Sequence, residues 1–268
     1  PFNITYQFTF APRYSWAQDR NWDSSESVFD TTHGSATRAS SRSIVWTLDN
    51  IIKLNYTFAQ KHLVDVTLLQ SAEQSQYWSE SMTGKQFSPT DILEWHNMQS
   101  ANEKTFSSND EKYTGDALMA RLFYSYDNRY MFTASVRRDG FSAFGRSNPR
   151  ATFPSLALAW NFSNESFFNW DPMSNGKLRI SWGKNGNRDI GIYQALSQLT
   201  TGSGISKYSY ATSAGTLYEL STLQIERMAN NDLKWESTAS WNVGLDFGFL
   251  NNRINGSLEW YYMPTTDL

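Results

Sequence analysis

The sequence predicts an all-β fold whose antiparallel strands run up and down, as in a segment of a transmembrane β-barrel. Two observations lead to this prediction. Apolar and polar residues alternate along most of the chain, which is the period of a β-strand. The connections between the alternating runs are short and long in turn, which is the arrangement of outer-membrane barrels. The 268 residues are compatible with a single domain of this class.

The segment 116–138 shows both features. Its first run places Leu118, Leu122 and Tyr126 on one face, and its second run does the same with Tyr130 and Val136. Between the two runs lie Asp, Asn and Arg at positions 127–129, and Asp and Asn suit a tight turn because they tolerate positive φ. The segment is therefore expected to form a hairpin with one apolar and one polar face.

Taken along the whole chain, the same pattern predicts about nine strands. They lie at roughly residues 3–14, 43–58, 61–78, 114–126, 129–140, 150–162, 176–186, 235–249 and 253–263. Short hairpins are expected at 58–61, 127–129 and 250–253, and long polar loops at 15–42, 79–113, 140–149 and 187–234. The connection 163–175 departs from the alternation, and its aromatic residues predict a short interfacial helix or a packed turn. Both ends of the sequence fall at a strand pattern, so we expect it to be part of a longer polypeptide.

Alternation alone also fits a soluble β-sandwich, in which the apolar face is covered by a second sheet. Two details favour a membrane barrel instead. The predicted strands of about ten to sixteen residues are longer than the usual five or six. Aromatic residues gather at strand ends beside the turns, as interfacial girdles do. These are Tyr124, Tyr126, Tyr130, Phe247, Phe249, Trp260, Tyr261 and Tyr262.

Composition argues against several other classes. A net charge of −3 gives no basic surface for nucleic acid. Cysteine is absent, which leaves no disulfide framework and no thiolate ligand for a structural zinc site. No apolar run approaches the ~18 residues of a membrane helix. The histidines, His33, His62 and His96, are far apart, and no catalytic motif is found, so neither a metal site, a cofactor nor an enzyme is expected.

Two sets of residues are candidates for function. Aromatic rings in or beside the long loops are suited to stacking on a ligand: Tyr77, Trp78, Trp95, Tyr208, Tyr210 and Tyr218. Charged residues on the polar faces of strands are expected to face the lumen, because Arg on the lipid face costs about 2–4 kcal/mol at mid-depth. These are Arg121, Arg137, Arg179, Asp246 and Glu259, which would pair with one another, hold a plug or line an import path.

Several motifs in the second half of the chain occur in a familiar order. They are Arg137-Arg138-Asp139-Gly140, Phe144-Gly145, Thr152-Phe153-Pro154-Ser155, Ala159-Trp160, the run 177–183, Asn185-Gly186-Asn187, and the runs 231–236 and 241–249. Their order and spacing resemble the C-terminal half of the barrel of SusC/RagA-type TonB-dependent outer-membrane transporters. The resemblance is specific from about residue 116 to 268 and weaker before 113.

This resemblance implies a 22-stranded barrel with an N-terminal plug. Residues 1–268 would be a partial barrel domain without the plug, the TonB box and the final strand. The whole protein would lie in the outer membrane of a Gram-negative bacterium, in contact with its lipid. It would import oligosaccharides, or peptides in some members, with energy from TonB and with a SusD-like surface lipoprotein as a lid.

Two alternatives remain open at this stage: a soluble carbohydrate-binding β-sandwich and a TonB-dependent receptor for an iron chelate. The sandwich differs from the barrel in one measurable way. It would bury Trp241, Val243, Leu245 and Phe247 against a second sheet, whereas a barrel would leave them uncovered by protein.

Overall fold

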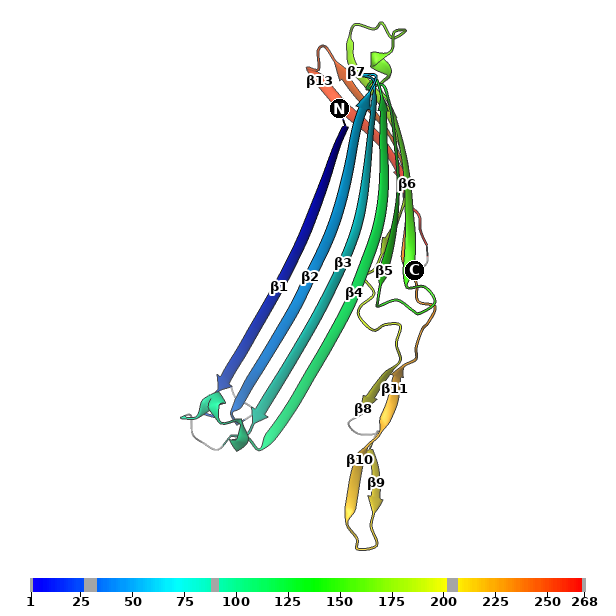
Figure 1. The fold of residues 1–268 in the computed structure, drawn as a ribbon. Coiled ribbons are helices and arrows are strands. Elements are labelled where there is room, and N and C mark those ends of the chain that lie inside the picture. The colour runs from blue at the N-terminus through cyan, green and yellow to red at the C-terminus, as the bar shows by residue number, and fades with distance from the viewer. Residues whose placement is uncertain (1, 27–32, 88–91, 202–206, 267–268) are drawn as a thin grey trace. The chain divides into compact units, whose positions relative to one another are not determined.

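The computed structural model describes residues 2–26, 33–87, 92–201 and 207–266 (Figure 1). Within these residues, one antiparallel sheet contains most of the chain, and its strands follow one another in sequence order. They are β1 (Phe2–Asp23), β2 (Ser35–Phe58), β3 (His62–Lys85), β4 (Glu103–Tyr126), β5 (Tyr130–Phe141), β6 (Arg150–Trp160), β7 (Met173–Asn187), β12 (Glu236–Phe249) and β13 (Ile254–Tyr262), with β14 (Thr265–Thr266) also paired to β12. The up-and-down all-β prediction is confirmed.

Smaller elements occupy the connections. Two hairpins lie between β7 and β12: β8 (Gln198–Thr201) pairs with β11 (Leu223–Arg227), and β9 (Lys207–Ala211) pairs with β10 (Leu217–Ser221). The helical segments in the described residues are the short 3₁₀ turns η1 (Glu94–His96), η2 (Met98–Ser100) and η3 (Phe162–Asn164). No helix in this part of the chain has the length and apolar character needed to cross a membrane.

The chain divides into two compact units. Unit 1 contains residues 1–7, 50–70 and 116–268, and unit 2 contains residues 8–49 and 71–115. Strands β1 to β4 contribute residues to both units. Each unit is described by itself below.

The strand register of unit 1 separates an apolar face from a polar one. One cross-strand row on the apolar face reads Leu158, Ile180, Val243 and Trp260, and a second reads Leu156, Trp182, Trp241 and Tyr262. Trp241 is 47% exposed, and Val243, Leu245 and Phe247 are only half-buried. None of the four is buried against a second sheet, so the sandwich alternative is not supported.

Aromatic rings gather along the hairpin turns of unit 1. Phe58 stacks on His62 at 4.4 Å between ring centroids, and His62 in turn lies 5.0 Å from Tyr126. Phe2–Tyr56, Tyr56–Phe58 and Tyr126–Tyr130 contacts extend this group, and two separate ring pairs, Trp160–Phe167 and Trp170–Phe249, lie at the remaining turns. We call these rings the turn-side belt.

Three of the residues expected in this belt lie elsewhere. Trp260, Tyr261 and Tyr262 are at the far end of β13 from its turn, because the strand already begins at Ile254. Tyr262 is opposite Trp241 in the register, and the Trp241 ring lies 6.2 Å from that of Trp182. Trp182, Trp241, Trp260 and Tyr262 therefore form a second aromatic group on the apolar face, at a distance from the turns, whereas Tyr261 lies on the polar face.

The predicted hairpins are confirmed at 58–61, 127–129 and 250–253. Asp127 and Asn128 have φ values of 52° and 54°, as the turn requires. Ala59 and Gln60 also take positive φ, at 48° and 57°, although neither residue type favours it. The pairing of β2 with β3 therefore imposes this conformation on the turn.

The long loops are shorter than predicted because β1 to β4 continue into polar sequence. The sequence pattern placed 15–23, 35–42, 79–85 and 103–113 in loops, but all four stretches are strand. A strand ladder needs only backbone donors and acceptors, so it can extend where neither face is apolar. The apolar alternation marks only the part of each strand with one apolar face.

Unit 2 has a small core where its strands end. Ala36, Phe87 and Ala101 are buried, and Trp22, Trp95 and Met98 pack around them. The Trp22 and Phe87 rings meet edge to face at 5.0 Å. The 3₁₀ turns η1 and η2, which carry Trp95 and Met98, are thus anchored to the end of the sheet.

The connection predicted at 163–175 lies at 161–172, and it is a packed turn that begins with the 3₁₀ turn η3. After η3, the buried Glu165 accepts hydrogen bonds from Trp160 Nε1 at 3.0 Å and from Arg129 Nη1 at 3.2 Å. Hydrogen bonds from Tyr130 and Trp160 lower the pKa of Glu165 below its usual range, with a further contribution from the Arg129 charge. Glu165 therefore ties this turn to the neighbouring β4–β5 hairpin.

We predict that Glu165→Gln lowers the resistance of the protein to urea at neutral pH. The native carboxylate has a lowered pKa, so its contribution is complete above the unfolded value of about 4.3 and is lost as the pH falls through the lower native value. The difference between the wild-type and variant midpoints should therefore shrink on acidification, as measured by chemical unfolding from pH 7 downward. A difference that is the same at every pH would contradict this account, and Glu226→Gln, on an exposed strand, is the matched control.

Candidate functional site on the polar face and at the loop junction

Three of the predicted polar-face residues form one ion-pair cluster across β7, β12 and β13. Arg179 donates from Nε and Nη2 to the two Asp246 carboxylate oxygens, at 2.8 and 2.7 Å. The same Nη2 donates to Glu259 Oε1 at 2.8 Å. A guanidinium that binds one carboxylate with two parallel hydrogen bonds is held in a defined orientation. The cluster joins three adjacent strands on the side opposite the apolar face.

A glycine makes room for this cluster. Gly244 is opposite Arg179 on one side and Glu259 on the other. A Cβ at position 244 would lie 3.0 Å from Nη2 of Arg179 and 3.1 Å from Cζ. The guanidinium therefore occupies the space that a side chain on β12 would fill.

The other two predicted polar-face residues lie apart from this cluster. Arg137 on β5 donates from Nε to Asp139 at 2.9 Å, two positions along the same strand. Arg121 on β4 is exposed and lines a groove with Lys53, Asn55 and Asp65. All five residues lie in unit 1, but only Arg179, Asp246 and Glu259 contact one another.

The sequence pattern did not reveal one further ion pair. Arg150 Nη2 donates to Asp116 Oδ1 at 2.9 Å, next to Gly140 on the strand between them. The two residues are far apart in sequence, so only the strand register brings them together. That register can be inferred from the hairpin turns, but not from the types of these two residues.

A second candidate site is the junction between the β5–β6 loop and the segment before β12. The Gly145 amide donates to the Leu233 carbonyl at 3.1 Å, and the Ser147 amide donates to the Asn231 carbonyl at 3.3 Å. A Cβ at Gly145 would overlap the Asn231 carbonyl, so only glycine allows the two backbones to approach this closely. We call this contact the loop junction.

Buried aromatic rings hold the loop junction together. The Trp235 ring stacks on Phe144 at 4.7 Å and meets Phe153 edge to face at 5.5 Å. All three are buried, with Trp235 6% exposed. A Cβ at Gly186 would overlap the Phe153 ring, so the absence of a side chain at this position leaves the space that the ring occupies. Sequence motifs distributed over 140–236 therefore meet in one place.

The aromatic ligand candidates fall into two groups. Tyr77, Trp78 and Trp95 belong to unit 2, and Tyr208, Tyr210 and Tyr218 belong to the β9–β10 hairpin of unit 1. On that hairpin, Tyr218 is 49% exposed and lies opposite Tyr210 in the register.

The three candidates in unit 2 differ in environment. Tyr77 and Trp78 are adjacent in β3, which continues to Lys85, so they lie in the strand and not at its end. Trp78 lies under the Arg42 guanidinium at 5.8 Å, and Tyr77 is exposed. The Trp95 ring packs against two side chains. It stacks on His96 at 3.6 Å between ring centroids and lies 4.8 Å from the Arg20 guanidinium.

Among the residues that the structure describes, no group of three His, Asp or Glu side chains is placed to bind a metal ion. His62 lies in the turn-side belt, 2.9 Å from the Tyr124 hydroxyl, and His96 stacks on Trp95. The sites of interest are therefore the ion-pair cluster, the loop junction and the two aromatic groups.

Comparison with known families agrees with this architecture. Residues 1–268 match the model of the family described as TonB dependent receptor-like, beta-barrel. The chain belongs to this family. It is a family of outer-membrane β-barrel proteins of Gram-negative bacteria.

Curated relatives cover much of the chain but are much longer than it. The TonB-dependent receptor SusC of Bacteroides thetaiotaomicron is 42% identical over 149 residues, which are 55% of this chain and 14% of SusC. The TonB-dependent receptor P39 of Formosa agariphila is 31% identical over 223 residues, which are 82% of this chain and 20% of P39.

The fold is also found in solved structures. A chain from the structure of the RagAB peptide transporter superposes with a TM-score of 0.84 at 20% identity, covering 98% of this chain and 28% of that chain. A chain of the RagAB peptide importer in the closed-closed state gives a TM-score of 0.80 at 23% identity, covering 99% of this chain and 28% of that chain. At this level of identity the likeness concerns the fold alone.

We predict that Asp246→Asn destabilises the barrel more than Glu259→Gln, because Asp246 accepts two hydrogen bonds from Arg179 and Glu259 accepts one. The Asp246 variant should lose about 1–2 kcal/mol of unfolding free energy. Chemical unfolding of the full-length receptor from lipid vesicles measures both variants. Gly244→Ala should cost less than Asp246→Asn, because the end of the flexible Arg179 side chain can shift slightly to admit the methyl group, whereas equal effects of the two carboxylate variants would contradict the geometry.

We predict that Gly145→Ala releases the β5–β6 loop from residues 231–233 without unfolding the sheet. The added methyl overlaps the Asn231 carbonyl and breaks the backbone hydrogen bonds of the loop junction. Limited proteolysis should cut the loop faster in this variant, while Ser213→Ala, at an exposed position in the turn of the β9–β10 hairpin, serves as the loop control. Trp235→Ala should have the same effect and cost about 3–5 kcal/mol by removing a buried ring. Unchanged cleavage in both junction variants would refute the role assigned to it.

Proposed function

We propose that this chain forms part of the barrel wall of an outer-membrane, TonB-dependent importer of nutrients. One observation carries the proposal: unit 1 has an apolar face that no second sheet covers and an opposite face with an ion-pair cluster. Hydrocarbon tails can cover the first face, and a hydrated lumen suits the second. Membership of the TonB-dependent receptor family supports the same arrangement.

The span of the apolar face fits a bilayer. On β12, Phe249 in the turn-side belt and Trp241 in the second aromatic group are eight residues apart. That corresponds to about 26 Å along the strand, or roughly 20 Å of depth at the usual tilt, close to the ~25 Å apolar band of outer-membrane barrels. Phe247, Leu245 and Val243 lie between the two rings on this face, and beyond Trp241 come Ala239 and Ser237.

The substrate class that we propose is oligosaccharide, with peptide as the second candidate. The motifs that resemble SusC/RagA-type transporters imply the first, in agreement with the 42% identity to SusC over 149 residues, and the fold shared with the RagAB peptide transporter is the reason to keep the second. Aromatic side chains stack on sugar faces, so Trp78 and Tyr218 are the ligand contacts that we would test first. A SusD-like lipoprotein and TonB are the proposed partners of the whole receptor, by its likeness to SusC and RagAB.

The proposal predicts that the full-length receptor, expressed in a Gram-negative host, is found in the outer membrane and binds oligosaccharides. Purified in detergent, it should retain oligosaccharides from a panel that also contains peptides and a ferric chelate. Trp78→Ala or Tyr218→Ala should weaken that binding roughly 3–10-fold if the ring stacks on the ligand. Isothermal titration gives the affinities.

Trp170→Ala is the matched control, because Trp170 belongs to the turn-side belt and to neither group of ligand candidates. A receptor that stays soluble in buffer without detergent would refute the barrel assignment. Exclusive binding of peptides or of the ferric chelate would refute the substrate class and leave the barrel assignment standing.

A further inference from the structure

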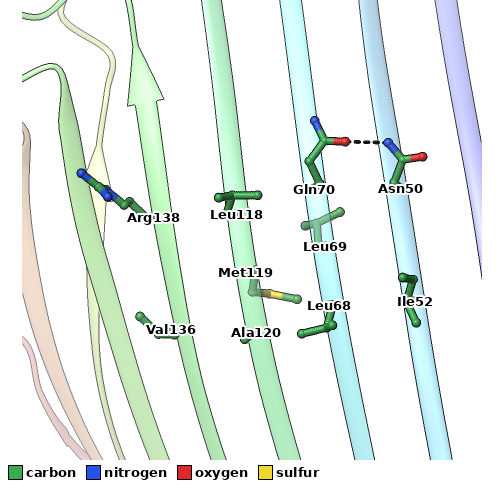
Figure 2. A pocket seen from close by; sticks show the side chains of 10 residues that line it. All are labelled: Asn50, Ile52, Leu68, Leu69, Gln70, Leu118, Met119, Ala120, Val136 and Arg138. Atoms are coloured by element: carbon green, nitrogen blue, oxygen red, sulfur yellow. Dashed lines mark hydrogen bonds between the residues drawn. The ribbon is translucent and has the colours of Figure 1, made fainter.

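One groove in unit 1 lies on the apolar face, where no ligand has been assigned. It runs across β2 to β5, and Ile52, Leu68, Leu118 and Val136 line its apolar part (Figure 2). All four of these side chains are exposed, between 38% and 56%. The groove therefore belongs to the surface that the proposed function turns towards lipid.

Polar side chains line one end of this groove. Asn50 Nδ2 donates to Gln70 Oε1 at 2.6 Å, and Tyr6 Oη donates to Asn50 Oδ1 at 2.7 Å. Figure 2 shows Asn50 and Gln70 joined at the upper end of the groove, with Arg138 on its other side next to Leu118. We call Asn50, Gln70 and Arg138 the polar row.

The polar row lies at one level relative to the turn-side belt. Asn50 precedes Phe58 by eight residues, and Arg138 follows Tyr130 by eight. Gln70 follows His62 by the same number. Eight residues are about 26 Å of strand, which is also the spacing of Phe249 and Trp241 on β12. The polar row is therefore at the second membrane interface, on the long-loop side.

Arg138 brings an uncompensated positive charge to this level. It is exposed, and within the described residues it makes no ion pair, since the adjacent Asp139 binds Arg137 on the other face. An Arg on the lipid face costs about 2–4 kcal/mol at mid-depth but only ~0–1 near an interface. Its position at the interface makes the charge tolerable and places it where lipid headgroups are found.

We propose that this groove binds an outer-leaflet glycolipid of the lipid A type, with an acyl chain along the apolar residues and a phosphate on Arg138. A guanidinium binds phosphate through two parallel hydrogen bonds, and the amide groups of Asn50 and Gln70 can donate to the sugar or phosphate oxygens. Long loops of outer-membrane barrels face the cell exterior, so the polar row faces the outer leaflet. This inference rests on the membrane embedding of the proposed function.

Charge complementarity favours this occupant over a second copy of the chain or another protein. Apart from Arg138, the residues lining the groove are uncharged, so the surface offers one cation above an apolar trough. An amphiphile with an anionic head and an alkyl tail matches both features at once. A protein partner would have to place an acidic side chain at this same depth.

The test measures retention of lipid A by the full-length receptor. The delipidated receptor in detergent is mixed with diphosphorylated lipid A or with a dephosphorylated form, and bound lipid is counted by native mass spectrometry. We expect the phosphorylated lipid to bind better to the wild type. Arg138→Gln, which keeps a hydrogen-bonding side chain of similar length, should weaken its binding about fivefold. The same variant should leave binding of the dephosphorylated lipid unchanged.

Arg253→Gln is the matched control, because it removes a cation from the turn at the opposite end of the strands. Equal binding of the two lipids, or equal binding by wild type and Arg138→Gln, would show that the groove takes lipid without recognising phosphate and would overturn the inference. Insertion into vesicles, followed by heat-induced mobility shift, is measured in parallel. Failure to insert would overturn both this inference and the proposed function, whereas normal insertion with equal lipid binding would overturn this inference alone.

Discussion

Backbone hydrogen bonding between neighbouring strands is the constraint on which the rest of this structure depends. In hydrocarbon no water can satisfy an amide or a carbonyl, so each strand must obtain its partners from the strands beside it. The sheet provides them from β1 to β13 in sequence order, through tight turns such as Asp127–Arg129. Once the ladder satisfies the backbone, the side chains need no protein cover. This explains why Trp241 and Leu158, both on strands paired on two sides, can be 47% and 57% exposed in a regular sheet.

The two faces of unit 1 follow from that arrangement. On the apolar face, rings contact one another along the turns, and exposed aliphatic residues fill the interval beyond them. On the polar face, charge is neutralised locally: Arg179 is shared by Asp246 and Glu259, and Arg137 pairs with Asp139. Glycine has a specific part in this, since Gly244 leaves the space that the Arg179 guanidinium fills. Large side chains and charges are thus accommodated without a conventional core.

The sequence predicted these faces well but not the extent of the strands. Alternation placed Arg179, Asp246 and Glu259 on one side because side-chain direction has a period of two, whatever the tertiary structure. The same criterion missed residues 103–113, where β4 has no apolar alternation and only the backbone hydrogen bonds show that it is a strand. It also missed the pair of Arg150 with Asp116, because their contact depends on register across an intervening strand. The sequence pattern also did not predict the loop junction. Gly145 and Asn231 meet through loop backbone, and loops have no periodic pattern of residues.

Membrane thickness explains a regularity that residue type alone does not. Asn50, Gln70, Arg138 and Trp241 have little in common chemically, yet each lies eight residues from a ring of the turn-side belt on its own strand. A sequence motif would repeat the same residue type, whereas a hydrocarbon layer of fixed thickness would repeat the same distance along each strand. What the four side chains share is that each combines a hydrogen-bonding group with a position at which water and headgroups begin. On β4 the residue at the same spacing from Tyr126 is the apolar Leu118, so hydrogen-bonding groups mark this level on some strands and not on all. Under the proposed function this level is where the hydrocarbon layer ends, and Arg138 is the member of the set that adds a charge there.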